Sequence, residues 1–399
     1  MASGGSVKVF SHDRDAVFVR RPNRFLIIAH DGEAELACHC PNPGRLIEFV
    51  FPGMNLILEK RAETRSAAKT QWTAVGIHYH GTVAPLFSAR ANAVAEQLIL
   101  DKIIPGLREV HAEFLLGGSR FDFLCIDQGG NRHLVEVKAC SLVEYGTAMF
   151  PDAPSLRALK HLEELAALSR EGYISHILFV IVHGGPERFI PNLHADPAFA
   201  AALSRLAYAP DMPEAARKSG KTAVHAALIR CNAQGRAVLA KPFVPVDLSC
   251  GALAEQNRGG YLLLVEIPQS QAVPVGALGT LTFSAGWYVY AGTARKNLSQ
   301  RLNRHLRKTR KGRHWHIDYL TPYAGKLKAL PILSYRNLEC ELAHALAALG
   351  GRAVAGFGAS DCRCKSHCYY FAEPPMENRR FVETLLRFRH VEWRGLSEN

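Results

Sequence analysis

A chain of 399 residues, 48% of them hydrophobic, is long enough for two or three domains with separate cores. Ten cysteines without a secretory signal argue against a disulfide scaffold and for reduced thiols in a cytoplasmic protein, and the lack of a long apolar segment or lipidation motif argues against a membrane partner. The formal net charge of +12 favours a polyanionic partner, which would be DNA, RNA or both.

The first part of the chain, residues 1–88, has the pattern of an OB-like antiparallel barrel. Short strand-like runs alternate with turn sequences such as Asp31-Gly32 and Pro52-Gly53. The expected strands are residues 17–19, 25–29, 35–39, 55–60 and 73–80. Such barrels bind oligonucleotides through basic and aromatic side chains, and the candidates here are Arg20, Arg21, Arg24, Phe25 and Arg45. The same basic residues could equally do no more than solubilise a structural barrel.

Within this barrel, Cys38-His39-Cys40 has the composition of a metal site but no second ligand pair nearby. Strand alternation places Cys38 and Cys40 on one face and His39 on the other. We therefore expect the two cysteines to be buried as small hydrophobic residues.

The second part, residues 89–248, has the pattern of an α/β core. A helix over residues 92–100 ends at Pro105-Gly106, and a hairpin follows with its turn at residues 127–131. The next helix leads to apolar strands at residues 176–183 and 223–231. Its expected buried side consists of Leu156, Leu159, Leu162, Leu165 and Leu168.

The hairpin carries a candidate site for metal-dependent phosphodiester hydrolysis. Alternation along the strand puts Glu136 and Lys138 on one face, and Asp122 follows the same rule on the preceding strand. Two carboxylates suffice to hold Mg²⁺ or Mn²⁺, because substrate phosphate and water complete the shell. Lys138 would orient or help to deprotonate the attacking water and offset charge on the phosphate, and Glu96 could supply a further acid. A Glu-x-Lys triplet alone is also typical of an exposed strand face.

From about Phe18 to Leu248, the sequence resembles the sugar fermentation stimulation protein A family, whose second half is similar to the PD-(D/E)XK nucleases. The resemblance rests, in chain order, on residues 21–25, 38–45, 119–123, 135–138 and 150–153, followed by Arg157, Lys160 and His161. It implies a nuclease-like core with Asp122, Glu136 and Lys138 in the active-site positions, and nucleic-acid binding. Phe121 stands where the first motif often has proline, which is a mild departure.

After an expected linker at residues 249–258, a third part begins with Gly259-Gly260-Tyr261, which opens an apolar strand over residues 259–267. A second strand, over residues 286–294, contains Tyr290-Ala291-Gly292. The helix expected at residues 297–306 repeats Leu298, Leu302 and Leu306 on its core face. Arg301 and His305 are also four residues apart and share another face.

These features make residues 259–375 similar to a small GIY-YIG nuclease domain. The resemblance implies that Arg301 contacts the scissile phosphate, that His305 assists, and that Tyr261 or Tyr290 helps to activate water. It also implies one metal ion on Glu339, with Glu341 as the second choice. Two departures are a longer insertion between the signatures and the extra Gly286-Trp287-Tyr288, which leaves the identity of the catalytic tyrosine open.

Charge in this part is one-sided. Between Glu266 and Asp318 there is no acidic residue, whereas nine Lys and Arg residues accumulate. Arg304 and Lys308 are the predicted nucleic-acid contacts, because each phosphate neutralised by such a cation releases condensed counterion. The run could instead be a solvated helix face.

The densest Cys/His cluster, at residues 360–368, offers Cys362, Cys364, His367 and Cys368 to Zn²⁺. All four lie in one loop, which would strain a tetrahedral shell, so a structural or substrate-facing loop is the alternative. Residues 207–220 have the pattern of a surface helix and turn, and residues 376–399 that of a C-terminal helix and tail.

The three parts together predict an α/β and α+β multidomain protein that acts as a metal-dependent nuclease on DNA, RNA or both. A further alternative is that one of the two nuclease-like domains is active and the other is inactive. PD-(D/E)XK enzymes that cut both strands often pair two sites, which suggests a homodimer. The competing hypothesis is a non-catalytic DNA-binding regulatory protein, which the family name itself suggests.

Overall fold

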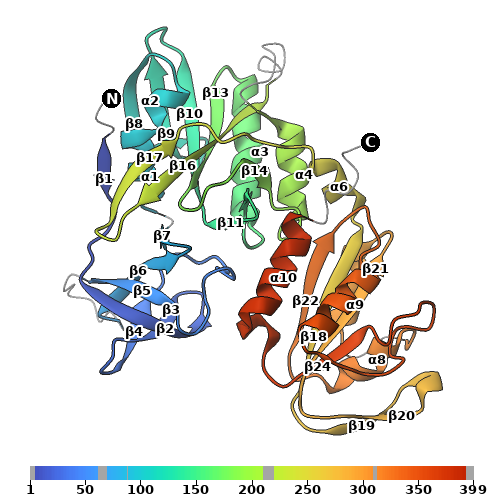
Figure 1. Ribbon diagram of the computed structural model, residues 1–399. Coiled ribbons are helices and arrows are strands. Elements are labelled where there is room, and N and C mark those ends of the chain that lie inside the picture. The colour runs from blue at the N-terminus through green and yellow to red at the C-terminus, as the bar shows by residue number, and fades with distance from the viewer. Residues whose placement is uncertain (1–4, 62–69, 88, 210–219, 309–311, 392–399) are drawn as a thin grey trace. The chain divides into compact units, whose positions relative to one another are not determined.

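The computed structural model describes residues 5–61, 70–87, 89–209, 220–308 and 312–391. The chain forms two compact units, Met1–Gly251 (unit 1) and Ala252–Asn399 (unit 2) (Figure 1). Within the described ranges, no helix is both long enough and apolar enough to cross a membrane. Of the segments discussed above, residues 210–219 and 392–399 lie outside the described residues.

Five strands of unit 1 close into the expected barrel. They are β2 (Arg14–Asn23), β3 (Leu26–His30), β4 (Glu35–His39), β5 (Asn55–Lys60) and β6 (Trp72–Tyr79). Antiparallel neighbours run in the order β4-β3-β2-β5-β6, and a parallel pairing of β4 with β6 closes the ring. Cys38 and Cys40 are fully buried in the barrel core, as strand alternation predicted.

The remainder of unit 1 is the expected α/β core. Its strands are β1 (Ser6–Lys8), β7 (Thr82–Pro85), β8 (Leu107–Leu116), β9 (Ser119–Asp127), β10 (Arg132–Cys140), β13 (Ile174–Ile181), β15 (Ala207–Tyr208), β16 (Thr222–Cys231) and β17 (Arg236–Lys241). The central order is β16-β13-β10-β9-β8, in which β10, β13 and β16 are parallel and β8 to β10 form antiparallel hairpins. β7 joins β16 to β6 of the barrel, and β1 pairs with β17. A small second sheet contains β11 (Leu142–Glu144), β12 (Thr147–Phe150) and β14 (Arg188–Pro191).

Helices cover both faces of this sheet. Neighbouring residues of a strand face opposite ways, so Leu134 and Val135 of β10 mark the two faces. Val135 packs with α1 (Ala91–Leu98) and α2 (Leu100–Ile103), whereas Leu134 packs with α3 (Leu156–Arg170) and α4 (Pro197–Leu206).

The buried side of α3 differs from the prediction at its start, because Leu156 is 85% exposed. Leucines spaced by three fall behind the helical turn by about 60° at each step, so the row drifts around the helix. The buried residues of α3 are Ala158, His161, Leu162, Leu165 and Ala166, so of the predicted row Leu162 and Leu165 are buried as expected. This rotation turns His161 toward the sheet.

Unit 2 is a five-stranded antiparallel sheet with helices packed on it. Its order is β22 (Leu327–Leu333), β18 (Gly259–Ile267), β21 (Gly286–Ala294), β24 (Cys368–Phe371) and β23 (Arg352–Ala353). The helices are α6 (Gly251–Gln256), which begins at the end of unit 1 and lies in the expected linker, α7 (Leu298–Leu306), α8 (His316–Leu320), α9 (Glu339–Ala348) and α10 (Arg379–His390). The insertion between the two signatures forms a hairpin of β19 (Gln271–Pro274) and β20 (Thr280–Phe283). Short 3₁₀ helices span Gly276–Leu278, Thr321–Tyr323 and Pro375–Glu377.

Two segments of unit 2 pack differently from the prediction: the end of α7 and the C-terminal helix. Leu306 is 40% exposed because it ends α7, and the neighbouring His305 is buried in its place. The C-terminal helix α10 is part of the unit 2 fold: Phe381 and Leu385 are buried, and the Arg389 guanidinium donates to the Pro331 carbonyl of β22.

A line of buried histidines crosses the sheet of unit 1. His133 Nδ1 lies 3.0 Å from His176 Nε2, and His176 Nδ1 lies 2.9 Å from His225 Nε2. Asp127 Oδ2 lies 3.3 Å from the outer nitrogen of His133. Burial holds the pKa of His176 well below its ordinary value and lowers that of His225 to about 4. Both rings are therefore neutral in the folded protein at neutral pH.

We expect unit 1 to lose stability as the pH falls from about 6.5 to about 4. In this window the histidines are protonated in the unfolded chain but stay neutral in the folded protein. The free energy of unfolding therefore falls as the pH falls, by about 1.4 kcal/mol for each pH unit by which the pKa of a histidine differs between the two states. His225→Gln should flatten this dependence in urea denaturation followed from pH 7 to pH 4, whereas His111→Gln, on the exposed surface of β8, should not. Equal pH slopes for the wild type and His225→Gln would contradict the prediction.

Candidate functional site

A cavity of about 610 Å³ in unit 1 collects the residues that the hairpin motif predicted. β9 and β10 supply Asp122, Glu136 and Lys138, and α1 supplies Asn92. Residues 42–44 of the barrel and residues 149–155, which run from the end of β12 to the start of α3, also line it. The cavity therefore lies where the barrel meets the α/β core.

Glu136 is held firmly through one of its two oxygens. The Lys138 ammonium donates to Glu136 Oε1, and His161 Nδ1 of α3 lies 2.5 Å from the same oxygen. Glu136 Oε2 is buried and has no hydrogen-bond partner among the described residues. A buried carboxylate oxygen without a donor carries a large desolvation cost, which a bound cation would relieve.

The two carboxylates have opposite electrostatic environments. Burial alone would raise the pKa of Glu136, but the hydrogen bond with His161 and the charge of Lys138 outweigh it and leave the pKa below its ordinary value. Burial, and then the charge of Glu136, raise the pKa of Asp122, although Val137 N and Asn92 Nδ2 both donate to it at 2.7 Å. Like charges at short range favour a cation between them.

Helix α1 presents Asn92 to this site and not the predicted Glu96. Asn92 lines the cavity and holds Asp122 Oδ1. Glu96 has an exposed side chain and does not line the cavity, because it lies one helical turn, about 5.4 Å, further along α1. The structure therefore does not bring Glu96 to the carboxylate pair.

Two segments that carry the family resemblance meet at the cavity wall. Asp152 Oδ2 accepts a hydrogen bond from Leu46 N at 3.3 Å, across 106 residues of sequence. A Cβ atom on Gly44 would lie 2.1 Å from the same oxygen, so a larger residue there would displace the Asp152 carboxylate. Arg21 organises this loop by donating to the carbonyls of Arg24, Asn42, Gly44 and Arg45. Arg21, predicted to contact nucleic acid, is thus engaged inside the protein.

The other barrel candidates divide by position. Arg20 forms an ion pair with Glu35 at 3.0 Å and does not line the cavity. Arg24 lines the cavity, and its guanidinium lies 4.7 Å from the centre of the Phe25 ring, which is 49% exposed. Arg45 is exposed. Arg24 and Phe25 together offer the charge and the stacking surface expected of a strand-binding site.

Sequence reasoning gave no role to Asn92, Asp152 or His161. Asp152 and His161 lie in segments that carry the family resemblance, and the resemblance could therefore have identified them as candidates for the site. Asn92 gave no signal, because its contact with Asp122 depends on how α1 packs on the sheet.

In unit 2, the two tyrosine signatures and α7 come together. Tyr261 Oη lies 2.9 Å from His305 Nε2, and the ring centres of Tyr261 and Tyr290 are 6.4 Å apart. The Arg301 guanidinium stacks on Trp315, which also contacts His305. Tyr288 donates instead to the Ser284 carbonyl at 3.2 Å, so Tyr290 is the second tyrosine of this cluster.

Burial raises the pKa of both Tyr261 and Tyr290 above its ordinary value. The two phenols therefore stay protonated and can position a group by donating hydrogen bonds. Glu339 begins α9, and its Oε1 lies 3.5 Å from His367 Nδ1.

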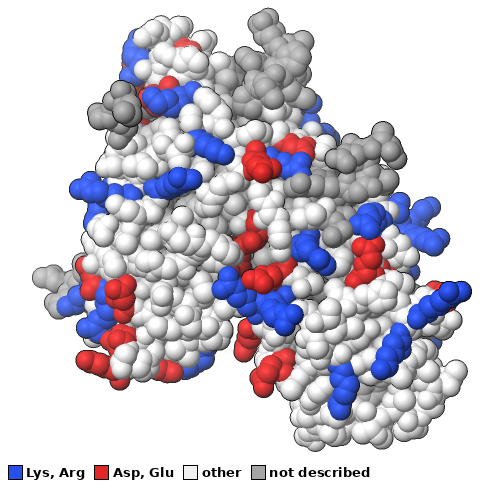
Figure 2. Space-filling model, viewed as in Figure 1, with Lys and Arg blue, Asp and Glu red and all other residues white. Residues whose placement is uncertain are grey.

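The predicted nucleic-acid contacts Arg304 and Lys308 are used within unit 2. Arg304 donates to both carboxylate oxygens of Asp318, at 3.0 and 2.9 Å, and Lys308 donates to the carbonyls of Ala324 and Gly325. Arg310 and Lys311 of the same basic run lie outside the described residues. In Figure 2 the barrel shows acidic as well as basic side chains on the face drawn. The net positive charge is therefore not distributed evenly over the surface.

The structure brings together three members of the predicted zinc set, Cys362, Cys364 and His367, but groups them with Cys340 and not with Cys368. Cys368 is fully buried at the start of β24, whereas the ligand atoms of Cys340, Cys362, Cys364 and His367 all lie within 4.8 Å of one another. Cys340 comes from α9, so the group spans two elements and not one loop.

Three family models match successive segments of the chain. They are described as the SfsA N-terminal OB domain, over residues 19–85, the sugar fermentation stimulation protein RE domain, over residues 89–209, and the domain of unknown function DUF123, over residues 260–390. The third segment is the one that resembles a GIY-YIG domain.

Relatives of known sequence and structure cover the first two segments. The sugar fermentation stimulation protein homolog of Pyrobaculum neutrophilum is 37% identical over 194 residues, which are 48% of this chain and 82% of the relative. The homolog of Clostridium botulinum is 37% identical over 192 residues, 47% of this chain and 82% of the relative. Pyrococcus furiosus SfsA, solved in complex with Ca²⁺, matches with 26% identity and a TM-score of 0.51 over 60% of this chain and 99% of its own. The chain belongs to the sugar fermentation stimulation protein family and carries a C-terminal DUF123 domain in addition.

Proposed function

We propose that unit 1 is a metal-dependent nuclease that hydrolyses phosphodiester bonds in DNA, RNA or both. The observation that carries this proposal is the free Oε2 of Glu136, buried beside Asp122 and Lys138 in a cavity large enough for a nucleotide. Buried polar atoms are normally hydrogen-bonded, so an unused carboxylate oxygen beside a second carboxylate favours a bound cation.

The donor set fits Mg²⁺ or Mn²⁺. Asp122 and Glu136 would hold the cation, since hard divalent cations prefer carboxylate oxygens. When bound, such a cation neutralises charge on the phosphate and makes water a better nucleophile. Pyrococcus furiosus SfsA was solved with Ca²⁺, which is also a hard cation that takes oxygen ligands, and this supports the proposal.

The neighbouring side chains hold the reacting groups in place. His161 and Lys138 fix Glu136 through Oε1, and Asn92 and Val137 N fix Asp122. Lys138 also brings a positive charge into the cavity, where it would orient the attacking water and stabilise the negative charge that develops on the phosphate.

For binding, we propose that a nucleic-acid strand follows the cavity rim along the barrel. Arg24, Arg120 and Arg157 line the cavity from the barrel, β9 and α3, and Phe25 offers a stacking surface beside Arg24. Arg45 adds an exposed charge to the adjoining loop.

Arg24→Ala is expected to weaken binding to nucleic acid and to reduce the slope of log K against log salt by about 0.9 on duplex DNA, because one phosphate contact is lost. Fluorescence anisotropy between about 50 and 200 mM salt would measure the slope. The matched control is Arg205→Ala, an exposed arginine of α4 outside the cavity lining, whose slope should equal that of the wild type. Equal slopes for all three proteins would place the strand elsewhere.

For unit 2, we propose a second phosphodiester site built from Tyr261, Tyr290, Arg301, His305 and Glu339. Arg301 and His305 lie on the same face of α7, next to the protonated hydroxyl of Tyr261, which is a suitable arrangement for holding a phosphate. Glu339 would hold a cation there. We favour unit 1 as the main site of cleavage, because the tyrosines and the histidine of the unit 2 site are almost entirely buried.

The test is cleavage of end-labelled single-stranded and duplex DNA and RNA by the purified full chain with Mg²⁺, Mn²⁺ or EDTA. Products that require a divalent cation and stop with EDTA are expected. Salt-sensitive binding without products on any substrate would favour the competing hypothesis of a non-catalytic DNA-binding regulatory protein.

A further inference from the structure

Three of the ten cysteines differ from the others in exposure. Cys340, Cys362 and Cys364 are partly exposed, whereas the remaining seven are buried. Free cysteines are among the most buried residues of proteins, so partly exposed ones in a single place need an explanation other than packing.

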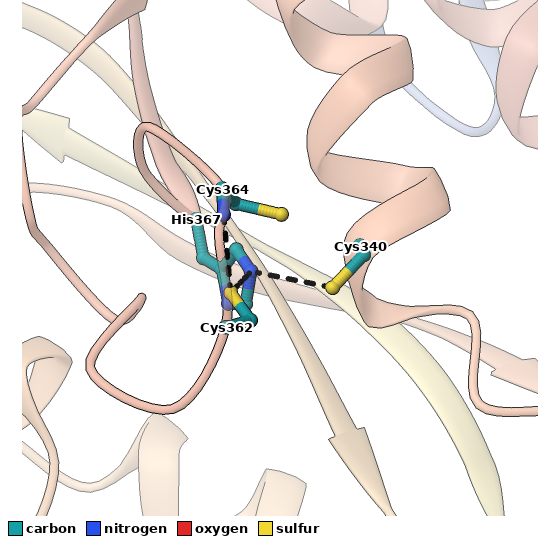
Figure 3. A group of neighbouring side chains, drawn as sticks. All are labelled: Cys340, Cys362, Cys364 and His367. Carbon is teal, nitrogen blue, oxygen red and sulfur yellow. Dashed lines mark hydrogen bonds between the residues drawn. The ribbon is translucent and has the colours of Figure 1, made fainter.

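The three thiols share this place with an imidazole. Cys340 is the second residue of α9, and Cys362, Cys364 and His367 lie in the loop between β23 and β24. Figure 3 shows the sulfur atoms of Cys340 and Cys362 turned toward the His367 ring, and that of Cys364 directed toward α9. Side chains from two separate elements thus converge on one point.

The spacing of the ligand atoms matches a tetrahedral shell. With bonds of about 2.3 Å to sulfur and 2.0–2.1 Å to nitrogen, neighbouring ligand atoms around Zn²⁺ lie roughly 3.5–3.8 Å apart. His367 Nε2 lies 3.3 Å from Cys362 Sγ and 3.9 Å from Cys340 Sγ, and all four ligand atoms lie within 4.8 Å of one another. Small side-chain movements would close the shell.

The other nitrogen of His367 provides an independent argument. The His367 ring is buried, and its Nδ1 lies 3.5 Å from Glu339 Oε1. A histidine that binds a metal through one nitrogen normally directs the other toward a carboxylate or carbonyl, which fixes the tautomer and orientation of the ring. His367 already has this arrangement, with Nε2 facing the thiols.

Charge around the group also suits a thiolate site. Three thiolates and a neutral imidazole leave a net charge of −1 around a divalent cation. Arg363 and Lys365 alternate with the ligands along the loop and are exposed, so both can offset this charge.

We propose that Cys340, Cys362, Cys364 and His367 bind one Zn²⁺ in a closed structural shell that ties the loop before β24 to the start of α9. Thiolate and imidazole ligands in tetrahedral geometry select Zn²⁺ over hard cations. Through His367, the shell also fixes the carboxylate of Glu339, which makes His367 a positioning residue for the second site. Only this last link rests on the function proposed for unit 2.

Zinc content tests the shell without any cleavage assay. The full chain, dialysed against a weak chelator, is expected to retain about one Zn²⁺ per chain in elemental analysis, and Co²⁺ in its place should give the intense visible bands of a tetrahedral thiolate site. Cys340→Ser, Cys362→Ser, Cys364→Ser and His367→Ala should each lose this stoichiometric binding.

Two matched controls come from the same neighbourhood. Cys368→Ala removes the buried neighbour of the ligands, and His344→Ala removes an exposed histidine of α9 whose Nε2 lies 3.8 Å from Cys364 Sγ. Both should retain one Zn²⁺. Retention in Cys340→Ser, loss in Cys368→Ala, or a metal-free protein with a disulfide among these cysteines would each overturn the proposal.

The link to Glu339 has its own readout. Glu339→Gln should still bind one metal ion but about 10- to 100-fold more weakly, as expected when the partner of a metal-bound histidine is changed, and the Co²⁺ bands should shift. Glu341→Gln is the matched control, because Glu341 pairs with Arg336 at 2.6 Å on the same helix. Identical affinity and spectra for both variants would remove the link and leave the shell.

Discussion

Glu136→Gln is expected to lower the rate of metal-dependent cleavage by about 10²- to 10³-fold, the range seen when one electrostatic group of a catalytic site is lost. The amide has nearly the same shape but no charge, so the free oxygen at Oε2 no longer attracts a cation. Binding should be retained, because the cavity arginines are unchanged. Single-turnover cleavage and anisotropy on the same substrate measure the two effects separately.

Glu163→Gln is the control for this variant. Glu163 is an exposed residue of α3, so the same chemical change should leave the cleavage rate at the wild-type value. Asp122→Asn provides a second variant if loss of the Lys138 and His161 contacts impairs the folding of Glu136→Gln. Full cleavage by Asp122→Asn and Glu136→Gln together with loss in Arg301→Ala would move the reaction to unit 2.

Asp318→Ala is expected to destabilise unit 2 by about 3–5 kcal/mol, the usual cost of removing one partner of a buried ion pair. Asp318 is buried and accepts hydrogen bonds from Arg304 and from the backbone N–H groups of His314 and Trp315. Burial alone would raise the pKa of Asp318, but hydrogen bonds from His305, Arg304 and the backbone hold it well below its ordinary value. Its contribution is therefore complete above about pH 4 and is lost as the pH falls further.

Hydrogen exchange of peptides from β18, β21 and α7 is the suitable measurement, since a protein of two units need not unfold in one step. These peptides should exchange faster in Asp318→Ala. Glu383→Ala, an exposed residue of α10 paired with Arg379, should change the stability by less than about 0.5 kcal/mol. Unchanged protection in Asp318→Ala would show that Arg304 finds water or another partner at little cost.

The sequence predicted well what depends on neighbours along the chain. Alternation within β10 placed Glu136 beside Lys138, and the structure joins them by a hydrogen bond. β18 and β21 have the expected bounds because both are mainly apolar runs that begin with glycine and are followed by polar residues. For the same reason, the five strands of the barrel were visible as separate short segments.

What the sequence did not predict depends on closure of the fold. Asn92 reaches Asp122, and Asp152 reaches Leu46, only once helices and loops distant in sequence have packed together. Cys340 was outside the expected zinc set because it comes from α9, and Cys368 was included because strand burial is not visible in a dense motif.

The positions of basic residues in the sequence were the poorest guide to the candidate nucleic-acid contacts. Arg21, Arg304 and Lys308 were expected to contact nucleic acid, yet each binds carbonyl or carboxylate oxygens of its own unit. The count of basic residues in a sequence gives the net charge but does not distinguish cations that face solvent from those that the fold uses internally. Arg24 and Arg157 matter more for the proposed function because the cavity leaves them exposed.

The pairing of β1 with β17 gives the barrel a second attachment. Because β1 precedes the barrel and β7 follows it, the chain enters and leaves the barrel from strands of one sheet. A domain joined by a single linker can swivel about it, whereas two anchors restrict rotation to small bending motions. The barrel residues that line the cavity should therefore keep a fixed position relative to the α/β core. Release of the short strand β1 would leave the barrel attached at one side only and free to move.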